Sequence, residues 1–424
     1  MSFSEFNTAV LGDLVTIKGG KRLPKGASLI SEKNSHPYIK IKDMNGGKKV
    51  RLSKTFEYVD DVTQKSIKNY IVNKNDIIIS IVGTIGLVSV IDDSLDNANL
   101  TENCVKLINL TNVDKDYLYY FLTSDTGQNE MRKGTVGSTQ PKLPIYNIKK
   151  IELPLPQLDI QKTIAHILST LDDKIEVNDQ INKTLENMAQ AIFKQWFMDF
   201  EFPNEEGEPY KSSGGEMVES ELGMIPKGWE VKGLDEIAEF LNGLAMQKFR
   251  PEENEKAYPV LKIKELRQGR TDESSDLCSS NIDEKYIVRD GDIIFSWSGS
   301  LLVDIWCGGN CGLNQHLFKV TSDKFDGWFV YQWNKYHLDR FVNIAKSKAT
   351  TMGHIKRKDL SDSKVLIPSD EIYLKAAQHQ KYLFEKIKYS KIEMKRLEEI
   401  RDALLPKLMS GKIRVPLDSE GDVS

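Results

Sequence analysis

The sequence predicts an α+β protein in which two tandem globular domains alternate with two long helices that pair as an antiparallel coiled coil. Three observations predict this fold class. The chain repeats itself, each copy opens with short strand-like segments, and each copy closes with apolar residues spaced by threes and fours. With 424 residues, 40% of them hydrophobic, the chain is long enough for two or three domains with cores of their own.

The repeat consists of five matched sequence blocks in the same order. The segment YIVNKNDIII from Tyr70 matches YIVRDGDIIF from Tyr286, and PYIKIKD from Pro37 matches PVLKIKE from Pro259. The other pairs of blocks begin at Leu14 and Ile237, at Leu100 and Leu313, and at Thr139 and Thr351. Generic strand patterns would not keep one order over five blocks, so we interpret the chain as a duplicated unit.

A long helix is predicted at the end of each copy. The 3-4 spacing of apolar residues lasts for several heptads, which favours a coiled coil over an ordinary surface helix. Leu171 matches Leu383 and Ile192 matches Leu404 at one constant offset, so the two helices are predicted to be equal in length. The apolar residues are Ile164, Ile167, Leu171, Ile181, Leu185, Met188 and Ile192, then Ala376, Leu383, Ile387, Met394, Leu397, Leu404 and Leu408.

The segment from Pro203 to Gly228 is rich in Gly, Glu, Ser and Pro and is typical of a connector. The predicted organisation is a first globular domain over 1–156, a central helix over 157–200, a linker over 201–228, a second domain over 229–368, a C-terminal helix over 369–412 and a tail over 413–424.

A duplicated domain–helix unit predicts a pseudo-dimer within one chain. If the helices pair antiparallel, a pseudo-two-fold axis relates the copies, and such symmetry in a DNA reader matches two half-sites at a fixed spacing. The alternative is that both helices serve only to dimerise with another chain, which leaves their equal length unexplained. Two polar residues in the apolar seam, Lys174 and Asn178, either fix the register of the helices or contact a partner.

Composition limits the function classes. The formal net charge is −4, from 58 basic and 62 acidic residues, so DNA binding would need locally clustered positive charge or a partner. Four cysteines argue against a disulfide scaffold and predict a reducing compartment. The first residues lack the pattern of a signal peptide. The longest uncharged run, from Ile77 to Ile91, is too short to span a membrane and is predicted to form strand, turn and strand. We expect a soluble cytoplasmic protein.

Catalytic motifs are not found in the sequence. Phosphate-loop, dinucleotide-binding, metalloprotease, nucleophile-elbow and amino-methyltransferase signatures are all missing. We therefore expect no reaction and no cofactor of the chain's own. One rival hypothesis is a zinc-dependent nuclease with Cys307, Cys311 and His316 as ligands, although zinc usually takes four ligands and the first copy offers only Cys104. Another is a coiled-coil scaffold whose paired domains bind a protein or a glycan.

Motifs spread over nearly the whole chain resemble those of one known family. They are AIFKQWFMDFEFP from Ala191, YKSSGGEMVESELGMIPKGW from Tyr210, GLNQHLFKV from Gly312, LPKLMSGKI from Leu405 and the pre-helix loop GSTQPKL from Gly137. On these segments the chain resembles the specificity (S) subunits of type I restriction–modification systems.

The resemblance implies two target recognition domains, each reading one half of a split, asymmetric DNA site. It also implies that the long helices bind two modification (methyltransferase) subunits, and that restriction subunits join as separate chains. S-adenosylmethionine, ATP and Mg are expected in those partners. The second pre-helix loop departs from the first, because Thr351-Met-Gly-His lacks the Gln-Pro pair, which puts equivalent base contacts by the two loops in doubt.

Base reading needs Arg, Lys, Asn, Gln or Ser side chains on loops that project from a rigid core. Lys40 and Lys42 alternate with isoleucines and are expected on one face of a strand. The candidates in the first domain are Lys18, Lys21, Arg22, Lys40, Lys42, Ser138, Thr139, Gln140 and Lys142. Those in the second domain are Asn242, Lys262, Lys264, Arg267, Arg270, Gln315, His316, Lys346, Lys348, His354, Lys356 and Arg357. For any single basic residue the alternative is a solvated surface charge.

Overall fold

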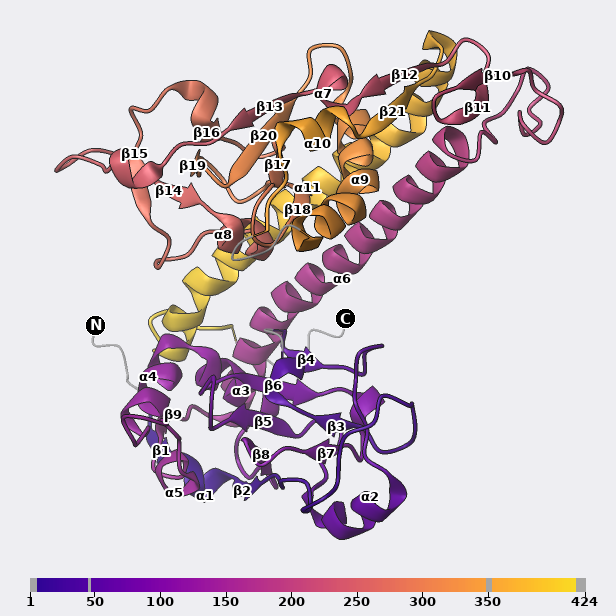
Figure 1. Ribbon diagram of the computed structural model, residues 1–424. Coiled ribbons are helices and arrows are strands. Elements are labelled where there is room, and N and C mark those ends of the chain that lie inside the picture. Colours follow the sequence, from indigo (N-terminus) through magenta and orange to yellow (C-terminus); the bar gives the residue numbers. More distant parts are fainter. Residues whose placement is uncertain (1–5, 45–46, 348–352, 417–424) are drawn as a thin grey trace, which may run out of the picture. The chain divides into compact units, whose positions relative to one another are not determined.

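The computed structural model describes residues 6–44, 47–347 and 353–416. The chain forms two compact units, the first from Met1–Lys174 with Leu397–Ser424 and the second from Ile175–Arg396. Each unit holds one globular domain together with parts of both long helices (Figure 1). The predicted α+β class is therefore confirmed.

Unit 1 is built around a five-stranded sheet in the order β2-β8-β5-β6-β4. β5 is buried along its whole length and pairs antiparallel with both β6 and β8, so the predicted strand, turn and strand over Ile77 to Ile91 is confirmed. The elements are β1 (Thr8–Val10), α1 (Leu11–Leu14), β2 (Thr16–Gly19), β3 (Tyr38–Ile39), η1 (Ile41–Asp43), β4 (Lys49–Val50), α2 (Asp61–Ile67), η2 (Lys68–Tyr70), β5 (Ile77–Ser80), β6 (Val88–Ile91), η3 (Asp93–Leu95), β7 (Asn99–Leu100), β8 (Cys104–Ile108), α3 (Lys115–Thr123), α4 (Asp125–Lys133), α5 (Ile145–Ile148) and β9 (Glu152–Pro154).

Unit 2 contains a four-stranded sheet in the order β13-β20-β17-β18 and a second sheet in the order β15-β14-β19-β16. Its elements are β10 (Met217–Ser220), β11 (Gly223–Pro226), β12 (Glu230–Gly233), α7 (Leu234–Ile237), β13 (Glu239–Asn242), η4 (Met246–Lys248), β14 (Ala257–Leu261), α8 (Ile263–Gln268), β15 (Leu277–Ser279), η5 (Glu284–Tyr286), β16 (Ile287–Val288), β17 (Ile293–Ser296), β18 (Leu302–Ile305), β19 (Cys311–Leu313), β20 (Leu317–Thr321), α9 (Gly327–Ser347), α10 (Arg357–Ser361) and β21 (Lys364–Ile367).

Four strands of the unit 1 sheet, β2-β8-β5-β6, share their order with β13-β20-β17-β18 of unit 2, and matched residues keep their register. Thr16 pairs with Ile108 across β2 and β8, and their sequence counterparts Glu239 and Thr321 pair across β13 and β20. Strands β5 and β17, β6 and β18, and the outer pairs β1–β9 and β12–β21 correspond in the same way. The sequence repeat is therefore a structural repeat at the level of individual hydrogen-bonded pairs.

Each domain has a lysine at the equivalent position of the second strand of its sheet, and both lysines have the same kinds of partners. Lys106 on β8 lies 3.9 Å from Asp76, and Lys319 on β20 lies 2.8 Å from Asp292. Each ammonium also donates to the carbonyl oxygen of an isoleucine. Because a largely buried cation needs both a counter-charge and a hydrogen-bond acceptor, this arrangement secures the centre of each sheet.

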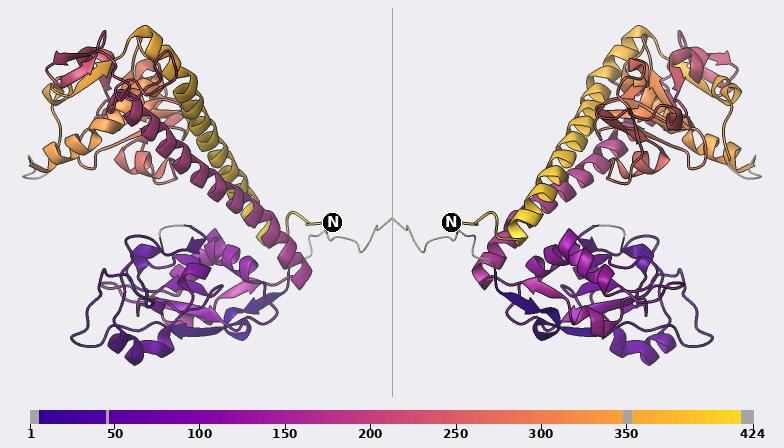
Figure 2. Two further views of the ribbon diagram at one scale, coloured as in Figure 1. Left: turned by 90° about the vertical axis from the view of Figure 1, so that its right-hand side faces the viewer. Right: turned by 90° about the vertical axis from the view of Figure 1, so that its left-hand side faces the viewer.

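The long helices are α6 (Leu158–Phe197) and α11 (Asp370–Met409), each of 40 residues. Their predicted equal length is confirmed. Within unit 2, Asn178 donates to Glu393 (2.8 Å) and Gln380 donates to the carbonyl oxygen of Ala189 (2.8 Å). Rising residue numbers on α6 thus meet falling numbers on α11, so the helices are antiparallel there, and both views of Figure 2 show them side by side in this unit.

Both helices contribute to the domain cores. In unit 1, Ile164 and Leu168 of α6 and Leu408 of α11 are buried in the main hydrophobic cluster. In unit 2, Phe197 of α6 and Ile387 of α11 belong to the corresponding cluster. Asn178 is buried to 2% exposure in the seam, which supports its role in fixing register, whereas Lys174 is exposed.

The connector after α6 is folded rather than extended. Strands β10 and β11 form an antiparallel hairpin, and Phe202 stacks between Tyr210 (4.6 Å) and Trp229 (5.4 Å). These aromatic rings join the core of unit 2. The Gly- and Ser-rich composition marks tight turns within a packed segment.

Candidate nucleic-acid interface

In unit 1 a glycine lets the end of β2 lie directly against the loop of residues 101–103. A Cβ atom on Gly20 would be 2.0 Å from the carbonyl oxygen of Thr101, so no larger residue fits. The Gly20 N–H donates to Cys104 O (2.9 Å), and on the far side of the loop the Ile81 N–H donates to Asn103 O (2.8 Å). Backbone hydrogen bonds therefore fix this loop from both sides.

Unit 2 repeats the arrangement at Gly243. Its Cβ would be 2.2 Å from the carbonyl oxygen of Asn314, and its N–H donates to Leu317 O at 3.0 Å. On the far side, the Trp297 N–H reaches His316 O at 3.4 Å. Gly20 and Gly243 are required by the close approach of two backbone segments.

A third loop joins each arrangement just before the short helix α5 or α10. The Leu143 N–H donates to Ile81 O (2.9 Å), and the Ile355 N–H donates to Trp297 O (3.1 Å). Lys142 forms an isolated antiparallel β-bridge with Val82, and His354 forms the equivalent bridge with Ser298. We call the resulting surface the loop edge and define it by residues 18–22, 81–82, 101–103 and 137–142 in unit 1 and by residues 241–245, 297–298, 314–316 and 353–355 in unit 2.

Several candidates of the first domain meet at the unit 1 loop edge. The Arg22 Nε donates to Glu102 at 2.7 Å while 79% of the Arg22 side chain is exposed. Burial opposes ionisation of Glu102, but hydrogen bonds from Arg22, from its own backbone and from Thr101 outweigh it and lower the pKa of this carboxyl. Glu102 is thus a fixed acceptor beside an exposed guanidinium.

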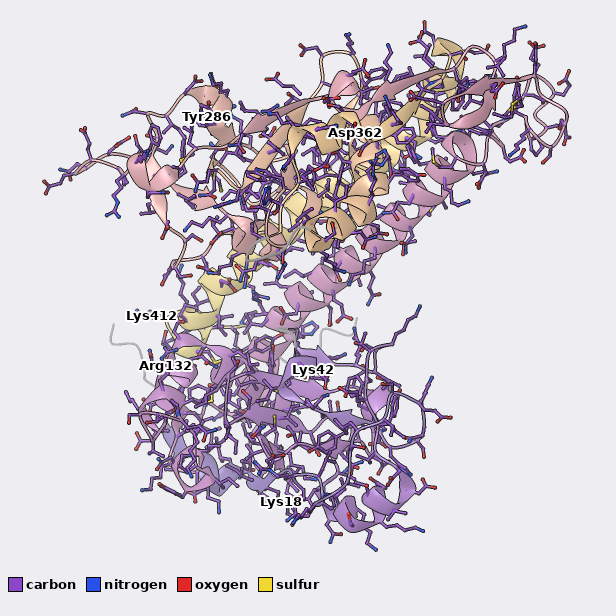
Figure 3. All side chains as sticks on the ribbon, viewed as in Figure 1. Lys18, Lys42, Arg132, Tyr286, Asp362 and Lys412 are labelled. Atoms are coloured by element: carbon purple, nitrogen blue, oxygen red, sulfur yellow. The ribbon has the colours of Figure 1, made fainter. Side chains whose placement is uncertain are left out.

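The other candidates of unit 1 lie around this pair. Lys21 is exposed, with its ammonium 5.3 Å from the ring centre of Tyr70. Lys18 lies on β2 and is exposed, and it and Lys42 are labelled in Figure 3. Ser138, Thr139, Gln140 and Lys142 are exposed on the turn closed by hydrogen bonds between Val136 and Lys142.

The expectation that Lys40 and Lys42 share the face of a strand is wrong. β3 ends at Ile39, and Lys40 caps the short helix η1, where its N–H donates to Asp43 at 2.8 Å. The Lys-Ile-Lys-acid pattern is a capping signal rather than strand alternation. Both lysines nevertheless converge on Glu57.

The matched segment of unit 2 behaves in the same way. The Lys262 N–H donates to Glu265 (3.2 Å) at the start of α8. The Lys262 ammonium pairs with Asp276, and that of Lys264 lies 3.2 Å from Asp272. Arg267 is exposed in the last turn of α8, and Arg270 is exposed just after it.

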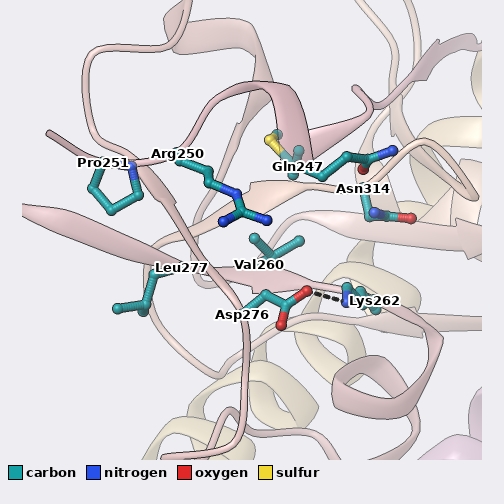
Figure 4. A pocket seen from close by; sticks show the side chains of 9 residues that line it. Gln247, Arg250, Pro251, Val260, Lys262, Asp276, Leu277 and Asn314 are labelled. Atoms are coloured by element: carbon teal, nitrogen blue, oxygen red, sulfur yellow. Dashed lines mark hydrogen bonds and ion pairs between the residues drawn. The ribbon is translucent and has the colours of Figure 1, made fainter.

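Each loop edge borders a cleft at the equivalent place. The cleft of unit 1, of about 450 Å³, brings together Arg22, Lys40 and Lys42 with Glu102. That of unit 2, of about 300 Å³, is lined by Gln247, Arg250, Lys262, Asp276 and Asn314 among others. Figure 4 shows the Arg250 guanidinium in this cleft together with the Lys262–Asp276 ion pair.

The candidates Asn242 and His316 meet around an aromatic residue in unit 2. The Trp297 Nε1–H donates to Asn242 Oδ1 (2.9 Å), and the Ser298 hydroxyl lies 2.9 Å from His316 Nδ1. Gln315 Nε2 lies 3.4 Å from His316 Nε2, and the ring of His354 is 6.4 Å from that of Trp297.

The remaining candidates of unit 2 lie apart from this cluster. The Arg357 side chain donates to Phe240 O (3.2 Å) and covers the ring of Phe318, beside a hollow lined by several acidic residues. Lys346 is exposed in the last turn of α9, and the Lys356 N–H caps α10 through Asp359 (2.7 Å). Lys348 lies outside the described residues.

Four residues are not among the candidates predicted from the sequence: Glu102, Trp297 and Ser298 of the loop edges and Arg250 of the unit 2 cleft. A prediction based on Arg, Lys, Asn, Gln and Ser leaves out acidic and aromatic residues, although a carboxylate accepts from cytosine N4 and an aromatic ring contacts the thymine methyl. The signal for Trp297 was available, because it directly follows a buried strand and precedes the Gly299 turn.

The cysteines of the zinc hypothesis lie in different surroundings. Cys307 packs in the main cluster of unit 2, and Cys311 packs in a separate one. Burial raises the pKa of Cys307 to about 11 and that of Cys311 to about 12, which disfavours thiolates. Within the described ranges no group of three His, Cys, Asp or Glu side chains is arranged to hold a metal ion.

Two domains with one backbone plan and different polar side chains at the same edge define a tandem recognition protein. Residues 4–187 and 226–401 match the type I restriction modification DNA specificity domain. The chain belongs to this family, as its sequence motifs predicted, and the scaffold alternative is not favoured.

The chain is 32% identical over 391 residues to the type I restriction enzyme MjaIX specificity subunit of Methanocaldococcus jannaschii, a match that covers 89% of this chain and 87% of the relative. It is 26% identical over 380 residues to the HindI specificity subunit of Haemophilus influenzae, covering 76% and 83%. The crystal structure of the type I restriction-modification S subunit from M. genitalium matches with a TM-score of 0.55 at 18% identity, covering 95% and 96%, and shows a shared fold. Among the described residues no helix is long and apolar enough to cross a membrane.

Proposed function

We propose that this chain selects the DNA target of a type I restriction–modification complex, with each domain reading one half of a split, asymmetric site. The observation that carries this proposal is the loop edge, whose backbone is held by equivalent hydrogen bonds in both units. Its side chains differ, with Thr101, Glu102 and Asn103 in unit 1 where unit 2 has Asn314, Gln315 and His316. Two loop edges with equivalent backbone but different side-chain donors and acceptors fit two half-sites of different sequence.

The long helices are proposed to dock the modification subunits. In unit 2, Val177, Ile181 and Met188 are 48%, 44% and 49% exposed and follow each other at helical spacing on α6. Tyr382 and Tyr389 of α11 are 61% and 65% exposed. Large apolar side chains gathered along exposed helix faces mark a surface for a protein partner.

The proposal assigns no reaction to the chain itself. Its relatives are named specificity subunits, which supports a role limited to recognition and assembly. S-adenosylmethionine would be bound by the modification subunits, and ATP and Mg would act with the restriction subunits.

The test uses the full chain assembled with its modification subunits and methylation-sensitive sequencing of the modified DNA. We expect one split target for the natural chain. Arg22→Ala and Glu102→Ala should relax the sequence preference within one half of it and leave the other half unchanged, because a base contact is worth about 1–3 kcal/mol of discrimination. The exposed Lys65 of α2 provides the control, Lys65→Ala. Unchanged targets in both loop-edge variants, or equal changes in both halves, would contradict the proposal.

A further inference from the structure

The loop edge of unit 2 contains a connected side-chain cluster that unit 1 lacks. Trp297 and Ser298 stand where unit 1 has Ile81 and Val82, directly after the matched strands β17 and β5. The backbone hydrogen bonds of Trp297 with His316 and Ile355 are equivalent to those of Ile81 with Asn103 and Leu143, so at these positions the two units differ chiefly in their side chains.

The indole of Trp297 is fixed from two directions. Its Nε1–H donates to Asn242 Oδ1 at 2.9 Å, and its ring stacks on Phe318 at 5.6 Å with an angle of 28° between the planes. Phe318 is 6% exposed. A ring held by one hydrogen bond and one buried aromatic neighbour keeps a single position. It therefore limits the positions open to the side chains beside it, such as that of His316.

Ser298 fixes the imidazole of His316. Its residue is 3% exposed, so its hydroxyl needs a partner within the protein, and His316 Nδ1 lies at 2.9 Å. The Gln315 amide nitrogen can only donate, so His316 Nε2 is the acceptor of that contact, and in the neutral ring the proton is on Nδ1, which donates to the Ser298 hydroxyl. Nε2 lies on the side of the Gln315 amide, at 3.4 Å from its nitrogen.

We propose that Trp297 and Ser298 are positioning residues that hold Gln315 and His316 against the edge of a purine in the half-site read by the second domain. This inference rests on the proposed function and deepens it. With one N–H of the Gln315 amide directed to His316 Nε2, the Oε1 atom and the second N–H remain as the acceptor and donor that pair with N6 and N7 of adenine in the major groove. In unit 1 the equivalent positions, with Ile81 and Val82 behind them, supply no such support.

The test compares Ser298→Ala, which removes the hydroxyl, with Ser298→Thr, which retains it. Trp297→Phe keeps an aromatic ring and removes the donor to Asn242. Val82→Ala in unit 1 is the matched control. Each variant is assembled with the modification subunits, and its DNA is analysed by methylation-sensitive sequencing and by binding to duplexes with each base exchanged in turn.

We expect Ser298→Ala and Trp297→Phe to lose purine preference at one position of one half-site, by about tenfold. Ser298→Thr should retain it, and Val82→Ala should leave that half-site unchanged. If Trp297 and Ser298 had a merely structural role, their variants would bind every duplex more weakly to the same extent, and that result would overturn the inference. The inference also fails if Ser298→Ala and Trp297→Phe both keep the base preference of the natural chain. If the natural complex shows no split target, the proposed function itself fails.

Discussion

At the scale of single residues, the adjacent Gly19 and Gly20 at the end of β2 differ in whether a larger residue would fit. Gly20→Ala would place a Cβ 2.0 Å from a backbone oxygen, whereas the Cβ of Gly19→Ala would meet only the end of the Ile145 side chain at 3.9 Å. We expect Gly20→Ala to reduce the free energy of unfolding by about 2 kcal/mol or more, because backbone has to shift. Urea denaturation measures the difference, with Gly19→Ala as the matched control. Equal stability of the two variants would contradict this account of the loop.

His337 of α9 should make unit 2 sensitive to acid. Burial, opposed by the hydrogen bond to Lys364 O at 2.9 Å and aided by Arg340, lowers its pKa to about 4. The unfolded chain, with an ordinary histidine pKa near 6.5, therefore takes up the proton more readily. The neutral, buried His337 therefore contributes about 3 kcal/mol to the free energy of unfolding above pH 6.5, and this contribution is lost as the pH falls from 6.5 towards 4.

The measurement for His337 is the urea midpoint as a function of pH. His337→Gln keeps a side-chain donor but does not titrate, so its midpoint should fall less between pH 6.5 and 4. Parallel curves for the natural chain and the variant would refute this prediction.

At the scale of elements, a partly buried ion pair joins α11 to β18 in unit 2. The Lys391 ammonium pairs with Asp304 and lies 4.0 Å from Glu186. Burial opposes its charge, but Asp304 and then Glu186 outweigh this and raise its pKa. Lys391→Met should cost about 1–2 kcal/mol, because the partly buried Asp304 carboxylate loses its partner. Asp304→Asn combined with Lys391→Met should recover part of that loss in urea denaturation. A double variant no more stable than Lys391→Met would show that the pair is not coupled.

The sequence predicted elements better than it predicted the site. The β-branched run from Ile77 to Ile91 and the constant helix offset depend on local periodicity, and both were confirmed. The strand expected at Lys40 was wrong, because a capping acid three residues later starts a helical turn. The contact of Trp297 with Asn242 spans 55 residues of sequence, and no local pattern reports it.

At the scale of the whole molecule, the net charge of −4 limits DNA affinity. Lys40, Lys42 and Lys262, which line the clefts beside the loop edges, are already engaged with carboxylates, so part of the positive charge there is neutralised. We expect the isolated chain to bind duplex DNA weakly and the complex with modification subunits to bind tightly, as a gel-shift assay would measure. Tight, sequence-selective binding by the chain alone would refute this.

The exposed apolar face of α6 provides a test of assembly. Ile181→Asp places a charge on this face, whereas Gln190→Asp places the same charge on an exposed position of the opposite face of the helix. We expect Ile181→Asp to reduce co-purification with the modification subunits at least tenfold, because desolvating a carboxylate opposes docking. Gln190→Asp should assemble normally. Comparable yields of complex from both variants would place the docking surface elsewhere.

The shared register of the two sheets has a consequence for how such proteins diversify. Hydrogen bonds between main-chain atoms hold the loop edges, and these bonds do not depend on which side chains the loops carry. Apart from Gly20 and Gly243, whose places admit no larger residue, point mutations there are expected to alter what is recognised while the folding free energy stays nearly constant. Evolution can thus explore new DNA preferences in one copy while the other keeps its own.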